Sequence, residues 1–112
     1  MSVDTLSKVL DIIVKGTKDI FGGKLVMTIL YGSYARGDYD SESDMDIAVL
    51  LNIDRTELCG YNKRIASLMT DLSLDFDLLV TFSCIPIDEF EKYKEALPYY
   101  RSINQEGVKL SA

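Results

Sequence analysis

The chain has 112 residues, of which 47% are hydrophobic and 27% charged. We expect a single domain spanning residues 1–112 around one apolar core, and this size excludes a two-domain enzyme. Its 12 basic and 18 acidic side chains give a net charge of -6. That charge repels phosphate backbones, so we expect neither DNA binding nor attachment to an anionic membrane.

Histidine is absent from the composition, and cysteine is sparse. With His 0, a Ser-His-Asp or Cys-His catalytic site and a His-ligated zinc are excluded, which leaves carboxylates as the acid–base groups. Cys59 and Cys84 form no CxxC motif, and the N-terminal segment lacks the continuous apolar stretch of a signal peptide. A soluble protein in the reducing cytoplasm is expected.

The first half of the chain predicts a helix and two buried strands. Apolar residues recur at helical spacing from Val3 to Phe21, and Gly22-Gly23 ends this pattern. Residues 25–31 form a nearly continuous apolar run, typical of a strand buried on both faces. A short helical turn and a polar loop should follow Gly32-Ser33, before a second buried strand over residues 45–51.

The second half predicts two more helical segments and two strands. Asp54 and Glu57 have the spacing of a capping box, which predicts a helix with core positions Leu58, Tyr61, Ile65, Leu68, Met69 and Leu72. Residues 74–82 predict a third strand, and residues 86–97 a short helix that ends before Pro98. A last turn over 99–106 and an edge strand at 108–110 complete an α/β or α+β fold, a small sheet covered by helices.

The Gly32-Ser33 pair follows a buried strand and precedes a short helix. Exposed backbone N–H groups, a hydroxyl and a glycine that permits close approach can together hold a phosphate. The same dipeptide is also typical of an ordinary strand-to-helix turn in which Ser33 caps the helix.

Asp44 and Asp46 flank Met45 at the start of the second predicted strand. Side chains two apart on a strand share a face, so the two carboxylates converge at one end of the sheet. Their repulsion is relieved by a cation, and hard oxygen ligands favour Mg²⁺ or Mn²⁺. The alternative is a solvated end of a loop.

Asp77 lies inside the third predicted strand, where an unpaired buried carboxylate is costly. Asp75 shares its face, and periodicity does not decide which of the two joins Asp44 and Asp46. An edge position with both acids in water is the alternative. A phosphate site beside three such carboxylates suits metal-assisted nucleotide transfer, in which one acid activates the attacking hydroxyl.

The segment GSYARGDYDSESDMDIAVLL resembles the signature of the DNA polymerase beta-like nucleotidyltransferase superfamily. Its Ala35-Arg36-Gly37 and Ser43-Asp44 resemble the bacterial group of minimal nucleotidyltransferases (MNT). The segment LDFDLLV is similar to the family's third-carboxylate strand, and INQEGV is similar to its closing segment.

This resemblance implies a mixed sheet flanked by helices and assigns roles to six residues. Gly32 and Ser33 would contact the triphosphate, and Asp44 and Asp46 would bind divalent metal. The Asp-Leu-Val pattern assigns the third acid, a further metal ligand, to Asp77, with Asp75 left open. Arg36 would contact phosphate or remain a solvated loop residue.

Minimal nucleotidyltransferases are commonly paired with a HEPN-domain toxin. The resemblance therefore implies an antitoxin that uses ATP and Mg²⁺ or Mn²⁺ to add AMP to a tyrosine of a HEPN partner. The small size also favours an acceptor on another chain. A non-catalytic antitoxin that occludes its partner is the alternative, and transfer to a small hydroxylated antibiotic is disfavoured. The sequence leaves the nucleotide base, the acceptor and homo-oligomerisation open.

Overall fold

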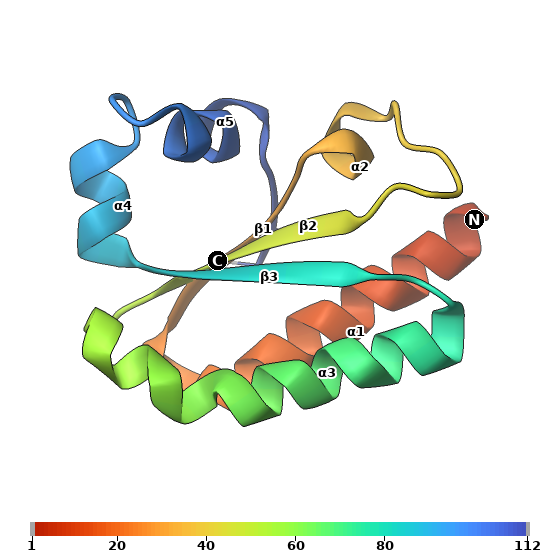
Figure 1. Cartoon of the computed structure of the whole chain (residues 1–112), viewed down its shortest axis with the longest axis horizontal. Coiled ribbons are helices and arrows are strands. Elements are labelled where there is room, and N and C mark those ends of the chain that lie inside the picture. The colour runs from red at the N-terminus through yellow and green to blue at the C-terminus, as the bar shows by residue number, and fades with distance from the viewer. Residues whose placement is uncertain (1, 112) are drawn as a thin grey trace.

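The structure, a computed structural model, describes residues 2–111 and has one four-stranded sheet with helices on both faces (Figure 1). The strand order is β3-β2-β1-β4. β1 is antiparallel to β2 and to β4, whereas β2 and β3 are parallel, so the predicted mixed sheet is confirmed. The strands are β1 (Leu25–Tyr31), β2 (Met45–Leu51), β3 (Val80–Pro86) and β4 (Val108–Ser111).

The helices divide between the two faces of the sheet. In Figure 1, α1 and α3 lie side by side on one face, while α4 and α5 lie on the other and α2 stands at the far end of that face. No helix within residues 2–111 combines the length and apolarity needed to cross a membrane. The helices are α1 (Val3–Phe21), α2 (Ser33–Arg36), α3 (Asn62–Phe76), α4 (Ile87–Tyr93) and α5 (Pro98–Glu106), with short 3-10 segments η1 (Gly22–Lys24) and η2 (Arg55–Tyr61).

The central strand β2 separates two apolar clusters. Its odd-numbered residues pack with α1 and α3, and its even-numbered residues Ala48 and Leu50 pack with α4 and α5. Every residue of β2 is buried except Asp46, which is half-buried and lies on the α4–α5 face. This two-sided burial explains the continuous apolar run that predicted the strand.

The third strand begins later than the sequence predicts. Residues 74–76 are the last turn of α3, which ends at Asp77 in the left-handed conformation (φ 52°), and β3 starts only at Val80. The predicted strand over residues 74–82 is therefore wrong over residues 74–79. Leu72 and Phe76 are spaced four apart, and both pack on the α1–α3 side of the core, so the helical period prevails there.

The predicted capping box at Asp54 is not formed. The Asp54 side chain makes no capping bond, and the Glu57 carboxylate accepts a hydrogen bond from Lys24 Nζ at 3.0 Å. The segment after Asp54 is the 3-10 segment η2, and α3 starts only at Asn62. Likewise α4 ends at Tyr93, and Pro98 opens α5, where its missing N–H costs nothing.

Candidate active site

The turn from β1 into α2 depends on Gly32. Its backbone has φ 75° and ψ -154°, a conformation that residues with a side chain rarely adopt. A Cβ at this position would also collide with Oδ2 of Asp46. Glycine therefore lets the backbone pass directly beside the Asp46 carboxylate.

The register of β1 and β2 places the Gly32 backbone beside the Asp46 carboxylate. Tyr31 lies opposite Asp46 in the β1–β2 pair, so the chain turns at the residue that immediately follows the pairing position. The Gly32 carbonyl accepts hydrogen bonds from the N–H groups of Ala35 and Arg36, both at 3.1 Å. The first N–H groups of a helix have no acceptor within it, so those of Ser33 and Tyr34 can bind a ligand. That they bind phosphate stays a prediction.

Asp44 immediately precedes the central strand and Asp46 is its second residue, on either side of the buried Met45. Burial raises the pKa of the Asp46 carboxyl, the charge of Asp44 raises it further, and the charge of Arg36 opposes the shift. Two carboxylates this close repel each other when both are ionised, and a bound cation offsets this repulsion. The donors are hard oxygens beside a backbone turn, so these residues fit Mg²⁺ or Mn²⁺.

Arg36 links α2 to the end of α5. Its Nε donates to Asp38 Oδ2 and its Nη1 donates to Glu106 Oε2, both at 3.2 Å. The guanidinium is exposed and its charge acts on Asp46. Arg36 thus lies at the rim of the site with two carboxylate partners, and its predicted phosphate contact stays a prediction.

Asp77 and Asp75 lie outside the sheet. Asp77 is the exposed residue that ends α3, and it lines a cavity of about 260 Å³ together with Asp44. Asp75 is exposed on the last turn of α3. In the described part of the chain, no three Asp, Glu or Cys side chains gather in a group that could hold a metal ion.

The β2–β3 register shows what stands beside Asp46 instead of a third acid. Thr81 pairs with Asp46, and Ser83 pairs with Ala48, so hydroxyl residues occupy these positions on β3. The structure therefore joins Asp44, Asp46 and the Gly32 turn, and it brings Asp77 only to the cavity that Asp44 lines.

A cluster of three hydroxyl groups on the same face has no counterpart in the sequence prediction. The Tyr31 hydroxyl lies 2.7 Å from that of Tyr99 and 3.2 Å from that of Ser83, and the last two lie 2.5 Å apart. Burial is the main cause that raises the pKa of Tyr31. The position of Tyr31 just before Gly32-Ser33 is the one sequence signal that could have indicated it.

The largest of the described cavities lies near the other face, at the end of the sheet where α1 begins. It measures about 430 Å³, and its walls include Tyr34 and Tyr39, whose rings stack with centroids 4.1 Å apart. Asp40 and Asp77 add two carboxylates to its lining. Neither Gly32 nor Ser33 lines this cavity, so the predicted phosphate site lies outside it.

A sheet of this topology, with a Gly-Ser turn against paired carboxylates, defines a nucleotidyltransferase fold. The sequence model of the nucleotidyltransferase domain family matches residues 10–110. This chain belongs to that family, and the predicted enzyme class is confirmed.

Two proteins of Methanocaldococcus jannaschii, both named as protein adenylyltransferases, are among its relatives. One is 35% identical over 96 residues, an alignment that covers 77% of this chain and 95% of that protein. The other is 31% identical over 94 residues, covering 84% of this chain and 86% of that protein. Both therefore match this chain over most of their own length.

Solved structures of toxin–antitoxin systems share the fold. A toxin–antitoxin with AMP-PNP aligns with a TM-score of 0.59 at 22% identity, over 92% of this chain and 73% of that chain. A tri-AMPylated Shewanella oneidensis HEPN toxin in complex with MNT antitoxin aligns with a TM-score of 0.55 at 20% identity, over 95% and 71%. These neighbours confirm the predicted fold class, which this chain shares with an MNT antitoxin.

Proposed function

We propose that this chain is a cytoplasmic antitoxin that transfers AMP from ATP to a tyrosine hydroxyl of a HEPN-domain partner. The observation that carries the proposal is the Gly32 turn, which has a positive φ and where a Cβ would collide with the Asp46 carboxylate. The relatives named as protein adenylyltransferases support a protein acceptor. The structural neighbours that pair an MNT antitoxin with a HEPN toxin support the partner.

Different residues of the chain would bind the phosphates and the metal ion during the transfer. Ser33 and the first N–H groups of α2 would bind the phosphates, and Arg36 would exchange its carboxylate partners for phosphate oxygens. Asp44 and Asp46 would hold Mg²⁺ or Mn²⁺, which when bound neutralises phosphate charge. The acceptor oxygen bonds to the α-phosphorus, the bond to the bridging oxygen breaks, and pyrophosphate leaves.

In the transfer to a partner, a base that takes the proton of the acceptor hydroxyl would accelerate the reaction. We assign that role to Asp77, which shares a cavity with Asp44, and keep Asp75 as the alternative. Asp77 follows a helix end and is exposed, so it can approach an acceptor without leaving a core position.

Labelling of the partner tests the proposal. The chain is incubated with Mg²⁺, radiolabelled ATP and the product of the neighbouring gene, which we expect to be a HEPN-domain protein, and the labelled tyrosine is mapped by mass spectrometry. Label on a partner tyrosine is expected, and it should be lost when Asp44→Asn and Asp46→Asn are combined. A double variant of the exposed Asp71 and Asp88 of α3 and α4, which removes the same charge, should retain it. An unlabelled partner in the wild-type reaction contradicts the proposal.

A non-catalytic antitoxin is the second candidate, and one observation favours it. Residues 2–111 contain no assembled group of three acids, although the predicted chemistry uses three. An occluding antitoxin needs its partner surface and not its carboxylates. Cells that express the HEPN toxin with the Asp44→Asn, Asp46→Asn variant should therefore die if transfer is required, and survive if occlusion suffices.

A further inference from the structure

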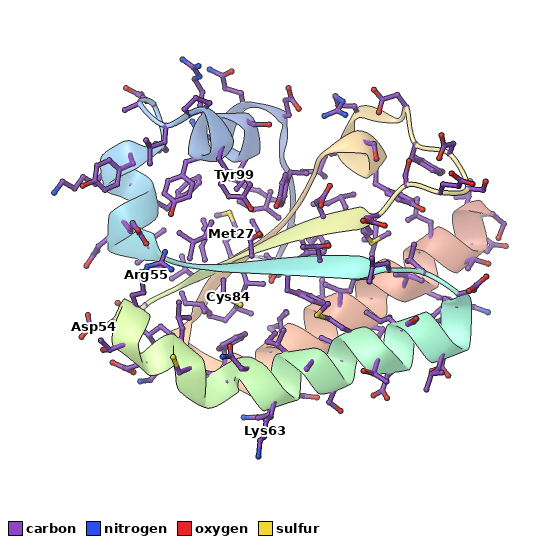
Figure 2. The ribbon with its side chains drawn as sticks, viewed as in Figure 1. Met27, Asp54, Arg55, Lys63, Cys84 and Tyr99 are labelled. Atoms are coloured by element: carbon purple, nitrogen blue, oxygen red, sulfur yellow. The ribbon has the colours of Figure 1, made fainter. Side chains whose placement is uncertain are left out.

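The hydroxyl cluster joins three separate elements on the sheet face that carries Asp46. Tyr31 ends β1, Ser83 lies in β3 and Tyr99 lies in the first turn of α5, and their hydroxyls are within hydrogen-bonding distance of one another. Figure 2 shows the labelled Tyr99 projecting from α5 toward the sheet. Tyr31 is 8% exposed, whereas Tyr99 is 47% exposed.

Strand register places this cluster next to the two carboxylates. Tyr31 pairs with Asp46, and Ser83 pairs with Ala48, two residues further along β2. Because β2 lies between β1 and β3, the contact from Tyr31 to Ser83 crosses β2 between Asp46 and Ala48. Ala48 has the small side chain that such a crossing needs. The Tyr99 hydroxyl, bonded to both ends of this crossing, therefore stands beside Asp46.

We propose that Tyr99 is an internal acceptor and that the chain adenylylates its own Tyr99 hydroxyl. This inference rests on the proposed function, because it uses the same ATP and the same carboxylates. The Tyr99 oxygen bonds to the α-phosphorus of ATP, and the bond from that phosphorus to the bridging oxygen breaks. Pyrophosphate leaves, and the phenol proton passes to solvent, which the half-exposed ring reaches.

Of the tyrosines on α4, α5 and β1, Tyr99 is the one that both contacts the hydroxyl cluster and is exposed enough to carry an adenylyl group. Tyr31 and Tyr100 are buried and leave no space for an adenylyl group. Tyr93 is exposed but lies on α4, with Lys92 over its ring at 5.3 Å and no bond to the hydroxyl cluster. An adenylyl group on Tyr99 would break its bonds to Tyr31 and Ser83 and cover the approach to Asp46. Self-transfer would thus slow later transfers to a partner.

The test is an incubation of the full chain with ATP and Mg²⁺, without partner, followed by intact-mass measurement and peptide mapping. A mass increase of one adenylyl group is expected, located on Tyr99 by fragmentation of the tryptic peptide 95–101. Tyr99→Phe should abolish the adduct, whereas the matched control Tyr93→Phe should retain it. Asp44→Asn with Asp46→Asn should also abolish it.

Two further readouts keep the outcomes distinct. Tyr99→Phe keeps its ring, and it should keep the rise in Tm that ATP with Mg²⁺ produces, so a missing adduct is not due to misfolding or lost ATP binding. A labelled partner with an unmodified chain overturns self-transfer and leaves the proposed function standing. An unlabelled partner and an unmodified chain overturn both, and an adduct that persists in Tyr99→Phe overturns the assignment to Tyr99.

Discussion

Gly32 is required for two reasons, its positive φ and the close approach of the Asp46 carboxylate. The residue has φ 75°, and its missing side chain leaves room for the Asp46 carboxylate. Gly37, five residues on, has φ 84° but faces open space. The two glycines therefore separate the cost of an unusual backbone from the cost of crowding the site.

Substitution of these glycines should affect stability and transfer differently. Gly32→Ala is expected to cost about 1–3 kcal/mol in the free energy of unfolding and to abolish transfer, because the new methyl group displaces Asp46. Gly37→Ala should cost about 1–2 kcal/mol and leave transfer near wild type. Thermal unfolding and the labelling assay measure both. Equal transfer by the two variants would contradict the role of Gly32.

The ionised Asp46 carboxylate is expected to lower the free energy of unfolding at neutral pH, because its pKa is raised in the folded protein. Its pKa is raised, first by burial and then by the charge of Asp44. A carboxyl whose pKa is raised in the folded state penalises folding at pH values above that pKa, and the penalty vanishes below the unfolded pKa. Asp46→Asn should therefore raise Tm at neutral pH, with a difference from wild type that shrinks as the pH falls. A lower Tm for this variant at neutral pH would contradict the assignment.

At the scale of elements, most of the fold could be predicted from the sequence where a single period dominates. The continuous apolar run of β2 and the helical spacing of α1 both predicted their elements with the observed bounds. The end of α3 could not be predicted, because alternating acids and apolar residues fit a strand as well as a helix. The tertiary contacts of Leu72 and Phe76 decide it.

The candidate site divides in the same way. Gly32, Asp44 and Asp46 are close together because neighbouring strands place them so, and their spacing along the chain already indicated it. The hydroxyl cluster unites Tyr31, Ser83 and Tyr99, whose separations in sequence follow no motif. Only the assembled sheet and the position of α5 bring them together.

The end of α3 carries a prediction about the third acid. Asp77→Asn keeps a residue that tolerates the left-handed conformation and removes the charge, so the fold should persist. If Asp77 is the base, transfer should fall about a hundredfold, whereas Asp75→Asn, two residues earlier, should change it little. Initial rates of partner labelling measure both. Wild-type rates in Asp77→Asn would leave that residue with the single role of ending the helix.

For the whole molecule, the net charge of -6 makes ATP binding depend on a local cation. With Mg²⁺, ATP at about a hundred times its Kd should stabilise the protein by about 2.7 kcal/mol, a rise in Tm of roughly 10–20 °C for a domain of this size. EDTA should remove most of this rise, and so should the Asp44→Asn, Asp46→Asn variant. An equal rise with and without EDTA would contradict the metal assignment.

The two faces of the sheet have different roles, one in the core and one in the candidate site. The face covered by α1 and α3 holds the larger apolar cluster, and the face toward α4 and α5 carries Asp46 and the hydroxyl cluster. The most direct test of this division is a crystal structure with Mn²⁺ and a non-hydrolysable ATP analogue. We expect an anomalous Mn²⁺ peak between Asp44 and Asp46, with the triphosphate against Gly32 and Ser33. Nucleotide in the cavity lined by Tyr34 and Tyr39, with no metal at the two aspartates, would contradict it.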